Sequence, residues 1–206
     1  MSGSKEERWN SVSHALGIVL GIIGLYFLLE NDTQKTVYSS VSTWVYSMSV
    51  ILLFTTSTSY HLATEPRLKA RLRIADHISI YLLIAGTYTP VALITLEQGN
   101  GWLILYIVWG IAALGTALKL FFTGKYEIFS LLLYLAMGWL IILDFSNLIA
   151  NTSSLGLWLL FAGGAFYTVG IIFYVWRRIP YNHFIWHLFV LGGAISHWGL
   201  IYIVVS

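Results

Sequence analysis

The sequence predicts an all-α protein, a bundle of seven transmembrane helices. Of its 206 residues, 58% are hydrophobic and 10% are charged, whereas about 25% of the residues of a soluble domain are charged. The mean hydropathy is +0.77. Seven apolar runs have the roughly 17–25 residues that a helix needs to cross the hydrocarbon core of a bilayer. Together these observations indicate a polytopic membrane protein.

The predicted spans follow one another with short polar breaks between them. Their approximate limits are 12–29, 37–62, 75–96, 101–121, 127–146, 154–176 and 182–205. The breaks are ENDTQKT, ATEPRLKARLRI, EQGN, TGK, NLIANTS and RRIPY. Pro66 and Pro180 lie in two of these breaks. Pro90 lies inside the third span, where we expect a kink because proline removes a backbone hydrogen bond.

The basic residues predict the orientation, because cytoplasmic loops carry an excess of Lys and Arg. With the N-terminus inside, 10 of the 11 basic residues lie in the cytoplasm and Lys35 lies outside. The N-terminus is therefore predicted to be cytoplasmic and the C-terminus outside. The short polar segment 1–11 precedes an apolar run without a small-residue cleavage site, so we expect a retained first span. The whole chain, 1–206, then forms a single transmembrane domain.

The composition excludes several classes of function. The chain has no cysteine, so it can form neither a disulfide framework nor a thiolate metal site. The net charge is +2 without a basic stripe on a polar surface, so nucleic acid is not an expected partner. A retinal protein needs a lysine in the membrane for its Schiff base, and the span 182–205 contains none.

Five of the six histidines are predicted to lie at the cytoplasmic end of the bundle. They stand at the starts or ends of the first, second, third and seventh spans: His14, His61, His77, His183 and His187. His197 lies about 15 Å deeper by helical rise. Ionisable groups within a membrane are costly and usually mark a functional site. Spans far apart in sequence therefore bring imidazoles to one level.

The spacing of three of these histidines suggests a metal ion. His183 and His187 are four residues apart, so they project from one face of a helix and can bind one ion. Ser57 and His61 share this spacing, and Asp76 begins the third span after a short loop. Histidines with a nearby carboxylate and no sulfur suit Zn²⁺ with an open fourth position. Haem held by His61 and His187 is an alternative.

These polar residues also have structural interpretations. Asp76 can be a carboxylate favoured at a helix start, and Ser57 can be a small residue at a helix contact. Three further histidines can be packing groups or polar groups around the ligands: His14, His77 and His197. Three residues before the first span can either cover the site from the cytoplasm or cap the helix: Glu7, Asn10 and Ser13.

Four blocks of the sequence carry a resemblance to a known family. They are EERWNSVSH at 6–14, STSYH at 57–61, ADHISIYLLIAGTYTP at 75–90 and HFIWHLFVLGGAISH at 183–197. The chain resembles the progestin and adipoQ receptor family, specifically its bacterial hemolysin III branch. The resemblance rests on these blocks, on their order and on the seven predicted spans. The resemblance covers essentially the whole chain and implies a multi-pass protein of the bacterial inner (plasma) membrane.

This resemblance implies a zinc ion near the cytoplasmic side, bound by His61, His183 and His187. It further implies that Asp76 hydrogen-bonds the zinc-bound water, with Ser57 close by. The more distant adiponectin receptors and the similar alkaline ceramidases suggest hydrolysis of a ceramide-like amide, whereas the name of the branch suggests cytolysis. Unlike the receptors, this chain has almost no N-terminal domain and negligible outer loops, which argues against a hormone-receptor role.

The hypothesis that follows is a zinc-dependent hydrolase of a membrane lipid, an N-acyl or ester compound that enters from the bilayer. In this hypothesis Zn²⁺ polarises the scissile carbonyl and Asp76 orients the attacking water and acts as general base. Ser57 hydrogen-bonds the developing oxyanion. The sequence indicates no particular protein partner.

Three other functions fit the same residues. A structural zinc can tie the second, third and seventh spans together in a non-catalytic receptor or scaffold, above all if Asp76 is a fourth ligand. Asp76, Asp144 and the histidines can form a proton or ion relay, although seven spans leave no even-numbered repeat typical of transporters. The third alternative is a pore-forming, cytolytic protein.

Overall fold

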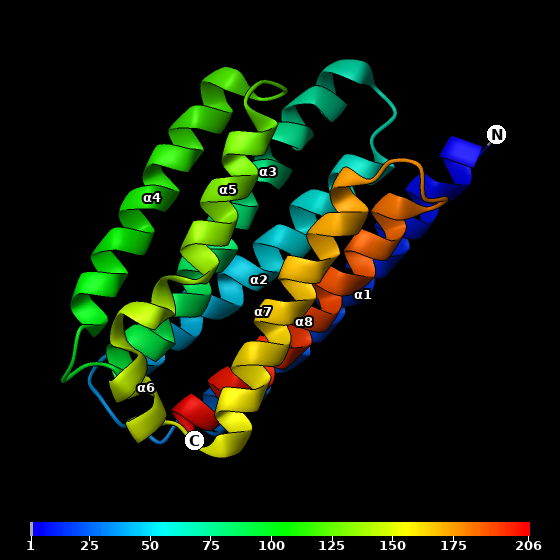
Figure 1. Cartoon of the computed structure of the whole chain (residues 1–206). Helices are drawn as coiled ribbons and strands as arrows, with labels where there is room; N and C mark the ends of the chain where they lie inside the picture. Colours follow the sequence, from blue (N-terminus) through cyan, green and yellow to red (C-terminus); the bar gives the residue numbers. More distant parts are fainter. Residues whose placement is uncertain (1) are drawn as a thin grey trace.

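The computed structural model describes residues 2–206, and the chain in this range is helical without any strand (Figure 1). The α-helices are α1 (Ser2–Glu30), α2 (Ser39–Leu62), α3 (Pro66–Pro90), α4 (Gly101–Phe122), α5 (Glu127–Gly138), α6 (Phe145–Asn151), α7 (Ser154–Val175) and α8 (Asn182–Val205). A π-helix, η1 (Val91–Thr95), extends α3, and a 3-10 helix, η2 (Leu140–Asp144), joins α5 to α6. The predicted all-α fold is confirmed.

Six helical segments within residues 2–206 are long and apolar enough to cross a membrane. They are Lys5–Glu30, Pro66–Thr95, Gly101–Phe122, Glu127–Asn151, Ser154–Val175 and Asn182–Val205. The helix α2 is not among them, because 11 of its 24 residues are Ser or Thr. Some of these hydroxyls donate to the helix's own backbone, as Ser49 does to the Tyr46 carbonyl at 2.6 Å. Such hydroxyls need no water, so α2 can pack between α1 and α3.

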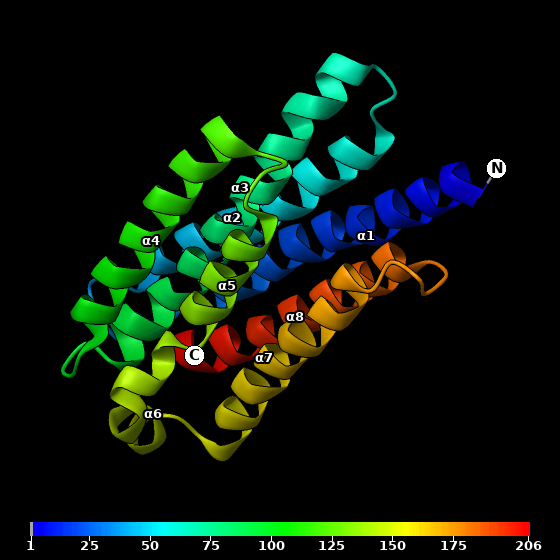
Figure 2. The same ribbon diagram turned by 45° about the horizontal axis from the view of Figure 1, so that its top comes forward.

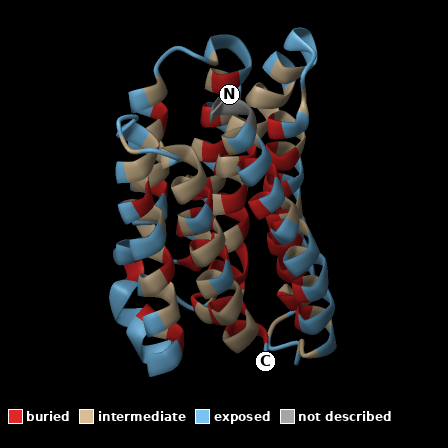
Figure 3. Ribbon diagram, turned by 90° about the vertical axis from the view of Figure 1, so that its right-hand side faces the viewer, coloured by how far each residue is buried: buried red, intermediate tan, exposed pale blue. Residues whose placement is uncertain are grey.

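The helices pack side by side in the order α7, α8, α1, α2, α3 and α4, and α3 also contacts α8 (Figures 1 and 2). The helix α3 packs against α2, α4 and α5, and α8 packs against α7, α1 and α3. Buried residues lie on the inward faces of the helices (Figure 3). The outward faces carry large apolar side chains; Leu114 is 72% exposed and Trp158 is 74% exposed. An exposed apolar surface of this kind is suited to contact with lipid.

Two polar segments expected outside the spans are helical. α1 is already helical at Ser2, so most of the segment 1–11 continues the first span. α3 begins at Pro66, nine residues before the predicted span. Proline is favoured in the first turn of a helix, and the Glu65 carboxylate accepts hydrogen bonds from the amides of Arg67 and Leu68 at 2.9 and 2.5 Å. Glu65 and Pro66 are thus a sequence signal for the start of α3 at this point.

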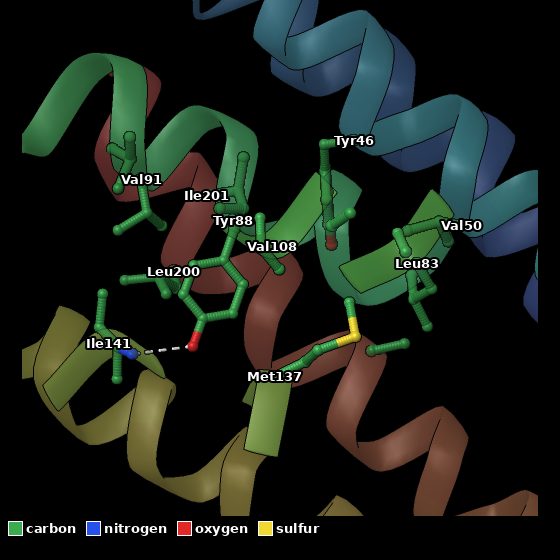
Figure 4. Packing of buried hydrophobic residues seen from close by; sticks show 14 of the residues in the cluster. Tyr46, Val50, Leu83, Tyr88, Val91, Val108, Met137, Ile141, Leu200 and Ile201 are labelled. Carbon is green, nitrogen blue, oxygen red and sulfur yellow. Dashed lines mark hydrogen bonds between the residues drawn. The ribbon is translucent and has the colours of Figure 1, made fainter. Parts of the chain in front are cut away.

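The predicted fifth span, 127–146, is interrupted. The helix α5 ends at Gly138, and η2 and α6 carry the chain on to Asn151. A break exposes backbone polar groups, which need partners within the protein where no water is present. Tyr88 of α3 provides them: its hydroxyl donates to the Gly138 carbonyl at 2.9 Å and accepts from the Ile141 amide at 3.0 Å (Figure 4).

Pro90, where the sequence predicts a kink, stands at the change from α-helix to π-helix. α3 ends at Pro90 and continues as η1, in which the Leu96 amide donates to the Val91 carbonyl at 3.0 Å. Around this point the buried core brings together α2, α3, α4, α5 and α8, with Tyr46, Val108 and Met137 among its residues (Figure 4). The irregular segments therefore contribute to the buried core, through Val91 of η1 and Ile141 of η2.

Glycines allow α7 and α8 to approach closely. A Cβ atom added to Gly163 of α7 would lie 2.2 Å from the His197 ring of α8. A Cβ atom added to Gly193 of α8 would lie 2.7 Å from the Tyr167 ring of α7. In each case an aromatic ring of one helix lies directly against a glycine of the other. Such close approach is typical of membrane helix contacts.

We expect Gly163→Ala to lower the midpoint of thermal unfolding in detergent. The added methyl group clashes with the His197 ring, and such overpacking costs about 1–3 kcal/mol. Gly164→Ala is the matched control, because a Cβ atom there meets nothing within 4 Å and alanine favours the helix. Equal unfolding midpoints for the two variants would contradict the proposed role of Gly163.

Candidate metal centre

Three histidines converge at the end of the bundle where α1 begins. His61 lies in the last turn of α2, and His183 and His187 lie in the first two turns of α8. One ring nitrogen from each lies within 4.8 Å of the others. His61 and His187 are buried and His183 is half-buried. Three imidazoles at this spacing can hold a metal ion.

The start of α8 directs its two histidines toward α2. Tyr181, just before the helix, has a left-handed backbone with φ 56°. The Asn182 side chain donates to the Phe173 carbonyl of α7 at 2.8 Å, which fixes the first turn of α8 against α7. His183 and His187 then lie one turn apart on one face of α8. Their ring centroids are 5.2 and 4.8 Å from that of His61.

The helix α1 contacts two of these histidines from outside the cluster. The Nδ1 atom of His61 lies 2.7 Å from a Glu7 carboxylate oxygen, and the Nδ1 atom of His187 lies 3.1 Å from the Asn10 carbonyl oxygen. With Nδ1–H donated in this way, Nε2 keeps its lone pair for a ligand. The Nε2 atom of His61 is buried and has no hydrogen-bond partner among residues 2–206. This donor set therefore fits a metal ion.

The contacts of Glu7 and Asn10 are clearer in the structure than in the sequence. The sequence leaves open whether these residues cover the site or cap the helix; in the structure the Glu7 carboxylate and the Asn10 carbonyl contact the rings of His61 and His187. Glu7 also pairs with Lys69 of α3 at 3.3 Å. The spacing of Glu7, Asn10 and His14 was an available signal, because residues three and four apart share one face of a helix.

A cavity of about 550 Å³ adjoins the cluster. Its lining includes Ser57 and Asp76 as well as the three histidines. Ser57 is buried one turn before His61, and Asp76 lines the same cavity from α3. Asp76 is not among the clustered ligand atoms. The described residues therefore offer three imidazoles, with a carboxyl and a hydroxyl next to them in the same cavity.

His77 belongs to a different group. Its Nδ1 atom lies 3.8 Å from Glu127 of α5, and its carbonyl accepts a hydrogen bond from Tyr134. Glu127 also pairs with Lys119 of α4 at 2.8 Å and with Arg73 at 3.4 Å. Lys119 is one of the ten basic residues expected at the cytoplasmic side, and its side chain is buried, with 1% exposed. This network ties α3, α4 and α5 together beside the cavity.

His197 and Asp144 lie away from the three-histidine cluster. The Nε2 atom of His197 lies 3.3 Å from the Leu160 carbonyl of α7, deep in the cavity lining. The Asp144 carboxylate accepts hydrogen bonds from the Asn100 amide at 2.7 Å and from the Asn147 side chain at 2.8 Å. Asp144 thus anchors the loop before α4, at the opposite end of the bundle from the start of α1 (Figure 1).

Comparison with known proteins identifies the family. The model of a family described as haemolysin-III related matches residues 3–198. The chain belongs to this family. It is 44% identical over 191 residues to Hemolysin-3 of Bacillus cereus, covering 92% of this chain and 87% of that protein. It is 43% identical to the Hemolysin-3 homolog of Bacillus subtilis (strain 168), with 92% and 90% covered.

A haemolysin-III relative is also found in mammals. The human Monocyte to macrophage differentiation factor is 31% identical over 203 residues, which cover 94% of this chain and 82% of that protein. The predicted relationship to the hemolysin III branch of the progestin and adipoQ receptor family is confirmed. The matches extend over nearly the whole chain, so they include every helix that contributes to the histidine cluster.

We expect Glu127→Gln to destabilise the protein more than Lys119→Met. The first substitution leaves a buried ammonium group without its carboxylate, which typically costs about 3–5 kcal/mol. The second removes the buried charge and leaves Glu127 with Arg73. The measurement is the midpoint of thermal unfolding in detergent, with the exposed Lys125 changed to Met as control. A larger loss in Lys119→Met would contradict this account.

Proposed function

We propose that this haemolysin III protein is a zinc-dependent hydrolase of membrane acyl lipids, either N-acyl or ester compounds. The observation that carries the proposal is the cluster of His61, His183 and His187 beside Asp76 and Ser57 in one cavity. No carboxylate among residues 2–206 joins the clustered ligand atoms. This arrangement is typical of a catalytic zinc site with one open position rather than of a closed structural site.

The proposed topology has seven spans, with the N-terminus in the cytoplasm. The helix α2 connects α1 to α3, and both of these have the length and hydropathy of spans. At about 1.5 Å per residue, the 24 residues of α2 are long enough to return across the bilayer. The excess of basic residues at the end where α1 begins supports a cytoplasmic N-terminus. We place the protein in the bacterial inner membrane.

Zinc is proposed from the chemistry of the ligands. The cluster offers three imidazole nitrogens and no sulfur, and Zn²⁺ favours imidazole ligands with a tetrahedral geometry. When bound, zinc would polarise a carbonyl group and allow a water molecule to ionise near neutral pH. Glu7 and the Asn10 carbonyl would hold the rings of His61 and His187 in the orientation for binding.

The protein's own residues would guide the reaction. Asp76 would accept a proton from the attacking water and pass it to the leaving group. Ser57 would donate a hydrogen bond to the oxyanion that develops on the scissile carbonyl. The cavity would hold the acyl chain against apolar residues such as Leu131 and Phe161.

The packing of the bundle supports entry of the lipid from the bilayer. The helix α7 packs extensively against α8, whereas α5 packs against α3 and α4. Both α5 and α7 line the cavity, through residues such as Leu135 and Gly164. An acyl chain can therefore enter between α5 and α7, which pack against different neighbours.

Cytolysis by pore formation is a second candidate, because two relatives carry the name Hemolysin-3. A pore should produce conductance in liposomes that does not depend on the three histidines. The hydrolase proposal predicts no such conductance. The same purified protein serves for both measurements.

We expect about one zinc per chain in the wild-type protein and none in His61→Ala or His187→Ala. Each substitution removes one of three ligands, which abolishes tight binding. Zinc content is measured by mass spectrometry after purification in detergent. His197→Gln is the control, because His197 lies outside the cluster. A well-folded wild-type protein without zinc, or variants that retain it, would disprove the metal site.

We expect Asp76→Asn to retain zinc and to lose hydrolysis by a factor of about 10²–10⁴, the usual contribution of a general base. Turnover is measured on a panel of fluorescent N-acyl and ester lipids, with zinc content determined in parallel. Ser57→Ala should also retain zinc and lose part of the activity. Full turnover in Asp76→Asn would exclude the proposed role of this carboxyl.

A further inference from the structure

The first half of α1 turns polar side chains toward the inside of the bundle. Asn10 and His14 are each 3% exposed, whereas Trp9 and Leu16 on the outward face are 53% and 51% exposed. Asn10 and His14 are four residues apart, so they share one face of the helix. Both side chains line the cavity that contains the histidine cluster.

The neighbouring serines satisfy their hydrogen-bonding groups locally, and Asn10 and His14 do not. The Ser13 hydroxyl donates to the Asn10 carbonyl at 2.9 Å, and the Ser11 hydroxyl donates to the Arg8 carbonyl at 3.0 Å. The Asn10 side-chain oxygen and both ring nitrogens of His14 are buried without a hydrogen-bond partner in residues 2–206. Buried polar groups without partners are costly, so these atoms call for a ligand.

Packing holds the His14 ring in place. The ring stacks on His187 with centroids 3.6 Å apart and an angle of 11° between the planes. It also contacts Phe54 of α2 edge-to-face, at 5.0 Å and 82°. His14 is not one of the clustered metal ligands. Its nitrogens are therefore held beside the cluster, in an orientation that is fixed before any ligand binds.

We propose that Asn10 and His14 form a binding subsite for an uncharged polar group of the lipid that both donates and accepts hydrogen bonds. The Asn10 side-chain oxygen is an acceptor, and a neutral imidazole has one donor and one acceptor nitrogen. A hydroxyl or an amide N–H with its carbonyl can satisfy both residues. An ionised phosphate or carboxylate is an acceptor only, so it would leave the Asn10 oxygen unpaired.

The subsite deepens the proposed function, because it selects among acyl lipids by the polar group next to the cleaved bond. It is adjacent to His187 and on the same cavity wall as Glu7. A lipid held there by α1 would present its acyl carbonyl toward the metal centre and its chain toward α5 and α7. Asn10 and His14 are positioning residues in this account.

The test compares two ligands with the same acyl chain, N-oleoylethanolamine and methyl oleate. Methyl oleate has no hydrogen-bond donor. Binding is measured in nanodiscs with full-length Asp76→Asn protein, both with zinc and after its removal by a chelator. We expect N-oleoylethanolamine to bind about tenfold or more tightly, since one unpaired buried group has an effect of that size.

His14→Phe preserves the ring stack and removes both nitrogens, so we expect it to abolish most of this preference without changing the zinc content. Asn10→Leu should have the same effect, because its backbone carbonyl still contacts His187. His14→Gln should restore part of the preference. Thr168→Val, at another polar position in the cavity lining, should retain all of it.

Equal binding of the two ligands by the Asp76→Asn protein would overturn the subsite, as would an unchanged preference in both His14→Phe and Asn10→Leu. The unpaired groups would then be satisfied by water alone. These outcomes are separate from failure of the proposed function. If the protein binds no zinc and hydrolyses no lipid but still prefers N-oleoylethanolamine, the subsite is supported and the proposed function fails. If the protein binds zinc and hydrolyses lipids but binds the two ligands equally, only the subsite is overturned.

Discussion

The structure depends on one constraint: inside a bilayer, polar groups must find their partners within the protein. Several of its features answer this constraint. Hydroxyls of α2 bond to their own backbone, and Tyr88 pairs with the groups freed where α5 breaks. Lys119 is buried against Glu127, and Asp144 accepts hydrogen bonds from the loop before α4. Apart from the hydroxyls of α2, these contacts join different helices or irregular segments.

Buried polar groups that have no partner within the described residues are informative, because an unpaired group is costly in this environment. Some lie at helix contacts, such as the Tyr46 hydroxyl. Others line the cavity that adjoins the histidine cluster: Asn10, His14 and His61. Unpaired nitrogen and oxygen atoms that share one cavity can be satisfied by one ligand, which is the basis of the proposed site. α1 contributes to this site as much as α2 and α8, although it supplies none of the three clustered imidazoles.

The sequence predicted the helices and the proximity of His61, His183 and His187. Hydropathy indicates the spans, and because successive spans run in opposite directions, it also indicates the end of the bundle at which each residue lies. It did not predict the break at Gly138, which depends on a hydroxyl from α3 fifty residues earlier in the chain. The burial of Lys119 likewise depends on Glu127 beyond a turn. The contacts of Glu7 and Asn10 depend on how α1 is rotated about its axis, which a short polar segment alone does not fix.

The composition of α2 has a consequence for biogenesis. A helix in which 11 of 24 residues are Ser or Thr gains little free energy from partitioning into lipid as an isolated segment. In the structure α1 and α3 pack against α2, and in the proposed topology they would stabilise it in the membrane. As a span, α2 would therefore enter the bilayer together with its neighbours, and the end of α2 that carries His61 would take its final position after α3 has been synthesised.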